Sequence, residues 1–155
     1  MLRLNPGELQ PVDLADLGWE HDAELLQLVY KPESGERSLE LTVRCNRDLG
    51  HAPWALLEGK RLVLAFIDVA VSEHVVFATV GRETLDAIRP GVSAGLHARI
   101  AGAIHMGLRF PDLAVSVSFH SGSWLQLICR QLMVGLAPPE PSPDSIHVPG
   151  SPSAP

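Results

Sequence analysis

A chain of 155 residues is the usual size of one domain, and its 46% hydrophobic and 19% charged residues provide a core that needs neither disulfides nor metals. The net charge of −6 disfavours a nucleic-acid backbone as partner, and no basic stripe with interleaved aromatics occurs. No run reaches about 18 uncharged apolar residues and no secretory signal opens the chain, so we expect no membrane span and a cytoplasmic location.

The first part of the chain is typical of a strap followed by strands. Residues 1–20 lack clear periodicity and predict a lead-in strap with one short turn of helix around 12–17. Residues 24–31 form a dense apolar run, and residues 38–45 alternate apolar and polar side chains, which is the pattern of a half-buried strand. The short turn-rich link between them, at 32–35, favours an antiparallel hairpin.

The middle of the chain predicts two more strands. A loop at 46–53 leads to a short run at 54–57. Residues 61–68 are apolar between polar ends, which suits a strand covered on both faces, and residues 69–80 add a further strand. The character of the sequence then changes at Gly81.

Two helices are expected after this point. Residues 82–89 (RETLDAIR) predict a short helix that ends at the following Pro-Gly pair. A longer helix is predicted from Ser93, as N-cap, to Leu108. Its apolar stripe is expected to face the sheet and consists of Leu96, Ile100, Ile104 and Leu108. Glycines weaken it by about 1 kcal/mol each and would allow a close approach to the sheet: Gly95, Gly102 and Gly107.

The last part of the folded chain is the clearest hairpin. Residues 113–120 alternate, Ser121–Ser123 form a turn, and residues 124–135 return. Consecutive apolar residues after Gln131 interrupt the alternation and predict a bulge or a change of burial there. Residues 137–155 are rich in proline and serine and predict a disordered tail.

These elements together predict a single α+β domain over residues 1–136. We expect an antiparallel sheet of about six or seven strands, folded over or sandwich-like. One main helix and one short helix between strands would complete it.

The sequence contains no recognised catalytic or metal-binding motif. Seven histidines occur without HExxH, HxH or CxxC, so neither metal nor other cofactor is expected, and His97 and His105 are expected to face solvent. Cys45 and Cys129 lie in strand patterns and are expected to be buried, unreactive free thiols. The Ser121–Ser123 turn lacks the GxSxG context of a hydrolase nucleophile.

The pair His21-Asp22, directly before the first strand, is the most suggestive polar feature. Neighbouring residues on an extended chain point in different directions, so the two cannot form a dyad with each other. A capping role is the simpler interpretation, with Asp22 accepting backbone N–H groups. The alternative is a ligand or acid–base pocket built from His21, Asp22 and His120.

The motif His21-Asp22-Ala23 before a strand, the alternating strand after it, a Trp-containing link and the final SGSWLQL hairpin resemble a group of small bacterial β-rich domains. Some of these are uncharacterised and others are immunity proteins of toxin systems. The resemblance covers about residues 19–136. It implies a sheet folded over itself, no cofactor, and function through binding a protein partner.

Three functions follow as hypotheses. The first is a non-catalytic protein-interaction domain, such as an immunity-type inhibitor, whose acidic balance suits a basic partner. The second is an enzyme or ligand-binding domain with a His/Asp pocket. The third is a structural subunit that self-assembles through an exposed strand at 132–136. The candidate functional residues are Trp19, His21, Asp22, His120 and Trp124.

Overall fold

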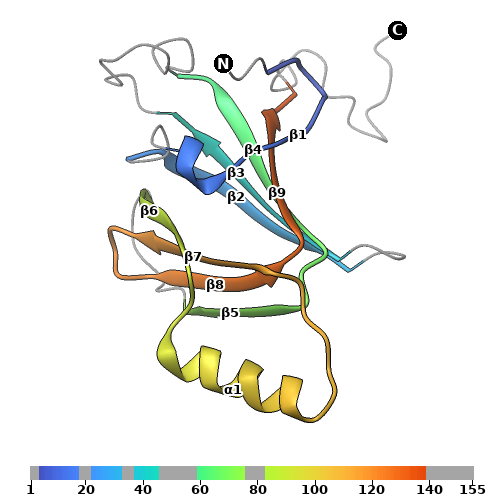
Figure 1. Ribbon diagram of the computed structural model, residues 1–155. Helices are drawn as coiled ribbons and strands as arrows, with labels where there is room; N and C mark the ends of the chain where they lie inside the picture. The colour runs from blue at the N-terminus through green and yellow to red at the C-terminus, as the bar shows by residue number, and fades with distance from the viewer. Residues whose placement is uncertain (1–3, 18–21, 33–36, 46–58, 76–82, 139–155) are drawn as a thin grey trace, which may run out of the picture.

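The computed structural model describes residues 4–17, 22–32, 37–45, 59–75 and 83–138, which form two antiparallel sheets, one α-helix and one 3-10 turn. Sheet A has the strand order β1-β9-β4-β3-β2, and sheet B has the order β5-β8-β7-β6. Figure 1 shows sheet A above, sheet B crossing below it, and α1 at the bottom. The bounds are β1 Gln10–Pro11, η1 Leu14–Asp16, β2 Glu24–Lys31, β3 Ser38–Arg44, β4 Arg61–Ile67, β5 Val71–Val75, β6 Leu85–Pro90, α1 Ala94–His105, β7 Leu113–Phe119, β8 Trp124–Cys129 and β9 Gln131–Leu136.

At two places the chain bends sharply at a corner and passes directly from a strand of one sheet into a strand of the other. β4 continues into β5 and β8 continues into β9, and the two pair with each other on both sides of the corner. Backbone hydrogen bonds from Ala70 to Ile128 and from Arg130 to Ile67 bridge the corner itself. The change of burial predicted near Gln131 is therefore the point where the last strand leaves sheet B and enters sheet A.

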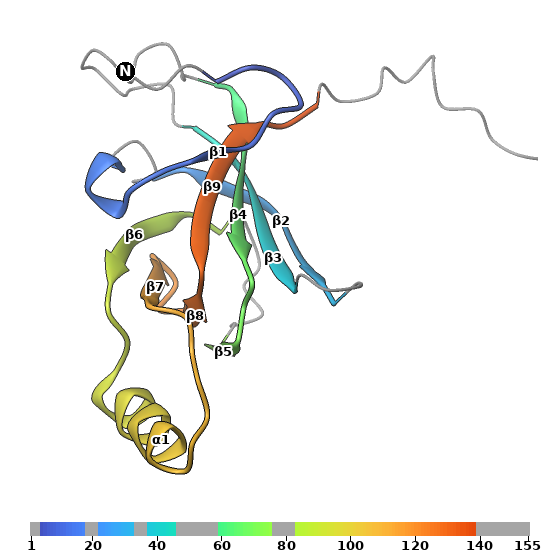
Figure 2. The same cartoon turned by 45° about the vertical axis from the view of Figure 1, so that its right-hand side comes forward.

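The opposite side of the molecule is closed by a short seam between β2 and β6. Glu24 and Thr84 form an antiparallel bridge, and backbone hydrogen bonds join Asp22 and Ala23 to Leu85. Sheet A is thereby joined to sheet B at both the corner and the seam. The strands enclose one apolar interior, in the manner of a small, flattened barrel (Figure 2).

The core is built from the inner faces of both sheets. Strict alternation on β3 places Leu39, Leu41 and Val43 inward, as the sequence predicted, and β4 contributes Leu62, Leu64 and Phe66. The register aligns these side chains in rows across sheet A. One row is Tyr30, Leu39, Phe66 and Leu132; the next is Leu28, Leu41, Leu64 and Val134.

The N-terminal segment is the predicted strap. It bridges Pro6 to Leu136 and pairs β1 with β9, and the expected short turn of helix is η1. The segment passes so close to Gly135 that a Cβ placed there would lie 2.5 Å from the Glu8 carbonyl oxygen. The strap covers the outer edge of β9. The prediction of an exposed edge at 132–136 is therefore wrong, because β1 occupies it.

The main helix is shorter than predicted and packs less. Ser93 caps it as expected, since its hydroxyl accepts the Leu96 backbone N–H, but the helix ends at His105. Leu96 is buried, whereas Ile104 and Leu108 are more than half exposed, so only the start of the predicted stripe faces sheet B. The prediction that its glycines allow a close approach is also wrong, because a Cβ on any of them would meet nothing within 4 Å. Figure 2 shows α1 set apart below sheet B.

The prediction of a short helix at 82–89 is wrong for the residues of this range that the structure describes. Leu85–Pro90 is strand β6, which pairs with β7 through a register shift between Leu85 and Ala87. The shift lets Leu85 and Ile88, three residues apart, both be buried, which imitates helical spacing in the sequence. Pairing with β7 and burial override the local helix propensity of RETLDAIR.

The remaining strand predictions are confirmed in outline. The hairpins β2–β3 and β7–β8 and the strands β4 and β5 lie within the expected ranges. The described residues hold nine strands against the six or seven expected, because β1 was not predicted, β6 replaces a helix, and the last run splits into β8 and β9. The expected run at 54–57 and the tail from 139 onward lie outside the described residues.

Candidate functional site

The seam between β2 and β6 brings together two of the candidate residues. His120 Nε2 lies 2.7 Å from Asp22 Oδ1, although the residues are 98 positions apart. Asp22 adopts a left-handed backbone conformation, φ 61°, just before β2, and its N–H donates to the Leu85 carbonyl. The His120 N–H donates to the Thr84 carbonyl. Side chains and backbone therefore join the starts of β2 and β6 to the β7–β8 turn.

A second set of hydrogen bonds lies beside this pair. The Ser121 hydroxyl donates to Glu83 Oε2 at 2.6 Å, and its oxygen accepts the Ser123 backbone N–H at 3.1 Å. The Ser123 side chain is fully buried, with its hydroxyl 2.8 Å from that of Ser121. Gly122, at φ 89°, supplies the left-handed residue of the turn. Ser121 therefore pairs with a carboxylate and with the turn, and not with His120 as a nucleophile would.

The Asp22–His120 pair is a surface contact that joins the two sheets. Both side chains are nearly half exposed, so water screens the interaction, and its free energy as an ion pair is small. Asp22 pairs with His120 through its side chain, and the capping role expected for it stays a prediction. Trp19 and His21 lie outside the described residues, and Trp124 is half-buried on the outer face of β8. His97 and His105 are exposed on α1, as predicted.

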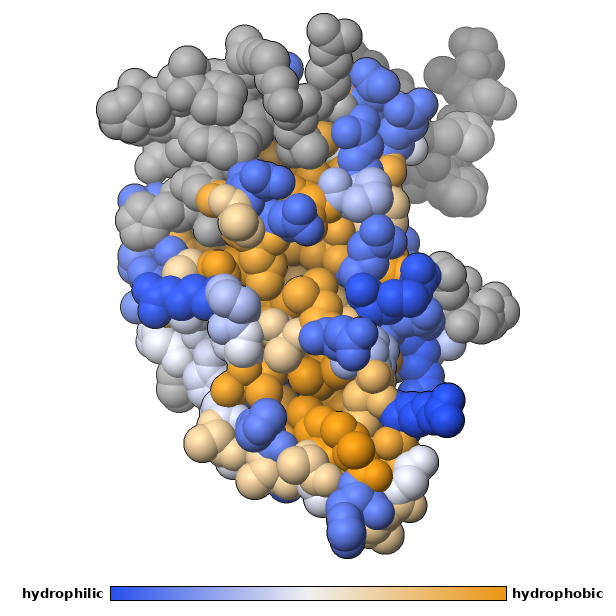
Figure 3. Space-filling model, viewed as in Figure 1, coloured by the Kyte–Doolittle hydropathy of each residue, from blue (hydrophilic) through white to orange (hydrophobic). Residues whose placement is uncertain are grey.

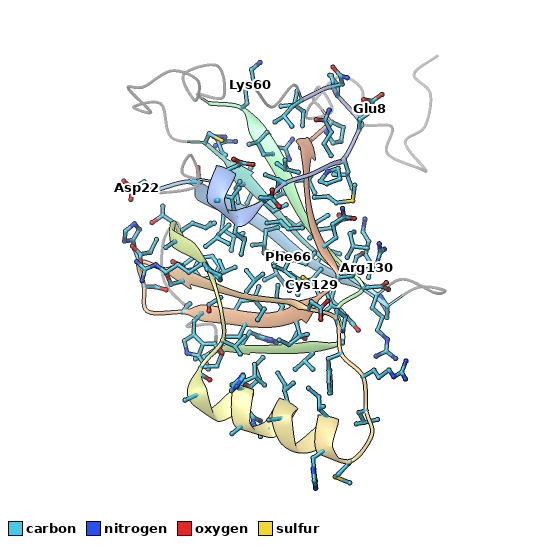
Figure 4. The ribbon with its side chains drawn as sticks, viewed as in Figure 1. Glu8, Asp22, Lys60, Phe66, Cys129 and Arg130 are labelled. Atoms are coloured by element: carbon cyan, nitrogen blue, oxygen red, sulfur yellow. The ribbon has the colours of Figure 1, made fainter. Side chains whose placement is uncertain are left out.

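A depression of about 460 Å³ lies at the β4–β5 corner, on the other side of the molecule from Asp22 (Figure 4). Arg130 Nε donates to Asp68 Oδ2 at 2.8 Å on its wall, and Asp68 has a left-handed φ of 54°. Its two arginines and two aspartates balance each other, so it favours neither anions nor cations. The lining residues are Arg37, Asp68, Val69, Ala70, Pro111, Asp112 and Arg130.

The interior contains two free thiols, Cys45 and Cys129, both buried as predicted. Burial raises the pKa of the Cys129 thiol to about 11, and a backbone hydrogen bond at Gln131 lowers it by less. The thiol is thus protonated and unreactive near neutral pH. Cys129 and Phe66, both labelled in Figure 4, belong to the same buried core cluster.

This pKa makes a pH-dependent contribution to stability. The folded state binds the Cys129 proton more tightly than the unfolded state, so the contribution is complete below pH 8.5 and is lost as the pH rises towards 11. Urea unfolding at pH 8 and pH 10.5 should show the advantage of the wild type over Cys129→Ala shrinking by about 2 kcal/mol. An advantage that stays constant across this range would contradict the assignment.

Three of the exposed large apolar side chains of the described residues lie at the end of α1. Ile104, Met106 and Leu108 are 54%, 85% and 58% exposed. Figure 3 shows apolar side chains at the foot of the molecule, over α1, with hydrophilic ones among them. We call these three residues the α1-end patch. Sequence reasoning assigned two of them to the buried stripe, and the signal it missed was the Met-Gly pair at 106–107, which ends a helix and turns its last side chains outward.

Hydrogen bonds fix the shape of the α1-end patch. Gly107, at φ 94°, donates to the Ile104 carbonyl, and Leu108 donates to the Ala103 carbonyl. This is the Schellman arrangement, which satisfies the last carbonyls of a helix. The patch is therefore presented by an ordered helix end.

The charges around the α1-end patch differ from those of the whole chain. Residues 87–111 contain Arg89, Arg99 and Arg109 and no aspartate or glutamate, whereas the chain has a net charge of −6. Arg99 is paired with Glu73 of β5. Arg109 is exposed and forms no ion pair with another described residue. Arg109, which directly follows Leu108 in the sequence, is therefore the basic residue next to the patch whose charge no described carboxylate offsets.

Comparison with protein-family models, curated proteins and solved structures gives no match to the chain. Within the described ranges, no three histidine, cysteine, aspartate or glutamate side chains converge as metal ligands would. In that same part of the chain no helix has the length and apolar character to span a bilayer.

Proposed function

We propose that this protein is a non-catalytic protein-interaction domain that binds its partner through the α1-end patch. The observation that carries the proposal is the exposure of three large apolar side chains on an ordered helix end. Burial of such side chains against a partner would lower the free energy by about 25 cal/mol for each Å² of apolar surface removed from water. Exposed apolar surface next to polar residues is a feature of interaction sites.

The local chemistry favours binding over catalysis. Methionine and arginine are enriched in protein interfaces, and both lie here within four residues, at Met106 and Arg109. Because the Schellman hydrogen bonds already order the segment, a partner need not immobilise it on binding. The only candidate acid–base pair in the described residues, Asp22–His120, is engaged in joining three segments.

The charge of Arg109 indicates the chemistry of the partner surface that it would face. A partner surface that presents apolar side chains among carboxylates would complement Arg109 and the acid-free stretch 87–111. The basic partner expected from the net charge of the whole chain stays a prediction for the rest of the surface. If the protein is an immunity-type inhibitor, the toxin surface that it covers here is acidic.

Site-specific photocrosslinking tests the proposal. A photoreactive residue at position 106 should capture one protein from a lysate of the source organism, through a peptide rich in acidic and apolar residues. The same residue at position 15, exposed on η1 and away from α1 (Figure 1), is the matched control. The captured protein, once purified, should bind Met106→Asp at least about ten-fold more weakly than the wild type.

Two results would refute the α1-end patch as the contact surface. One is capture of the same proteins at equal yield from positions 15 and 106. The other is unchanged affinity of the captured protein for Met106→Asp, measured on a variant whose thermal unfolding matches the wild type.

A further inference from the structure

The edge of strand β2 offers a second interaction surface, independent of α1. β2 is the terminal strand of sheet A, and its contact with β6 ends where the Leu25 N–H donates to the Glu83 carbonyl. From Leu26 to Lys31, the outward edge receives no backbone hydrogen bond from any described residue. An edge of this kind is a template for another strand.

The side chains on this edge are apolar and incompletely covered. Leu28 and Tyr30 lie on the inner face, opposite the buried Leu41 and Leu39, yet they are 40% and 46% exposed. They are the outermost members of the two apolar rows that cross sheet A. Each row therefore stops at a side chain that one more strand would cover.

The sequence of the edge complements itself. If two copies of β2 pair antiparallel about a two-fold axis at Val29, Leu28 lies opposite Tyr30 of the second copy, and Val29 lies opposite Val29. Gln27 then meets Lys31, so apolar residues face apolar ones, polar residues face polar ones, and no like charges meet. Lys31 keeps its ion pair with Glu40, 3.0 Å away on β3.

We propose that the protein forms a homodimer in which the two β2 strands pair antiparallel about Val29, joining the two A sheets into one. Each inner-face row then continues across the axis, from Tyr30 of one copy to Leu28 of the other. Four apolar side chains are buried in this way at the centre of the interface.

The proposed register predicts how charge at positions 28 and 30 controls assembly. The variant Leu28→Lys/Tyr30→Glu places opposite charges across the axis and should remain dimeric. The variants Leu28→Lys/Tyr30→Lys and Leu28→Glu/Tyr30→Glu place like charges there and should each be monomeric, with a dimer Kd raised at least about ten-fold. Mixing these two should restore a dimer. Multi-angle light scattering and sedimentation equilibrium of the full chain measure all four cases.

The variants control for one another, since all alter the same two exposed side chains and differ only in charge. A monomeric wild type at roughly 100 μM would overturn the proposal. Equal masses for the Lys/Glu and Lys/Lys variants, or no dimer on mixing the Lys/Lys and Glu/Glu variants, would also overturn it. Circular dichroism of each variant verifies that a change of mass is not unfolding.

Discussion

Replacing Phe66 with alanine is expected to lower the free energy of unfolding by about 3–5 kcal/mol. Phe66 is fully buried in β4, the central strand of sheet A, between Leu39 on β3 and Leu132 on β9. The rigid rows around it cannot collapse fully into the space it leaves, so the loss combines hydrophobic transfer and a cavity. Urea unfolding monitored by circular dichroism measures the change.

The matched control is Met106→Ala, which removes a large apolar side chain that is 85% exposed. Its effect on stability should stay within about 0.5 kcal/mol. A loss below about 1 kcal/mol for Phe66→Ala would mean that Phe66 does not lie in a packed interior between the sheets, and would refute the core described above.

Replacing Gly135 with alanine is expected to detach the N-terminal strap from sheet A and to destabilise the protein by about 1–3 kcal/mol. The new Cβ would lie 2.5 Å from the Glu8 carbonyl oxygen and 3.0 Å from Leu9 Cδ2, and backbone cannot yield as a flexible side chain does. Hydrogen exchange of the Val12 amide, which donates to the Leu132 carbonyl, should accelerate in the variant.

Gly102→Ala is the control for this substitution. It adds the same methyl group where nothing lies within 4 Å, in the interior of α1. The helix should gain up to about 1 kcal/mol, because alanine has the higher helix propensity. If both glycine variants changed stability in the same direction and left exchange at Val12 unaltered, the close passage of the strap over Gly135 would be refuted.

The strands that sequence reasoning located are those whose periodicity reflects one buried face. Residues 38–45 and 113–120 alternate because one side of each strand is buried in the core, and that information is local. Strand β6 was not predicted, because its bulge places the buried residues three positions apart, as in a helix. A folded-over or sandwich-like sheet was predicted, but the strands that join its two layers were not. They depend on the pairing of 61–67 with 131–136 and of 71–75 with 124–128, which no local pattern specifies.

The candidate residues likewise divide into features that the local sequence indicates and features that depend on long-range pairing. One hypothesis placed Asp22 and His120 in a common pocket, and the structure does bring the two side chains together. The β2–β6 seam that positions them was not predicted. The α1-end patch was hidden for the opposite reason. Ile104 and Leu108 fit an ideal helical stripe with Leu96, and the end of the helix at His105 removes them from that face.

The pairing of β4 with β9 determines when sheet A can be completed during synthesis of the chain. β2, β3 and β4 emerge from the ribosome early, yet the far side of β4 stays unpaired until β9, near the end of the folded region, is made. A nascent three-stranded sheet with two open edges is prone to pair with other chains. Leu62 on β4 pairs with Leu136 on β9, so the fold is completed late and through a long-range contact. Chaperone binding to the growing chain is therefore expected to cease only once β9 has emerged.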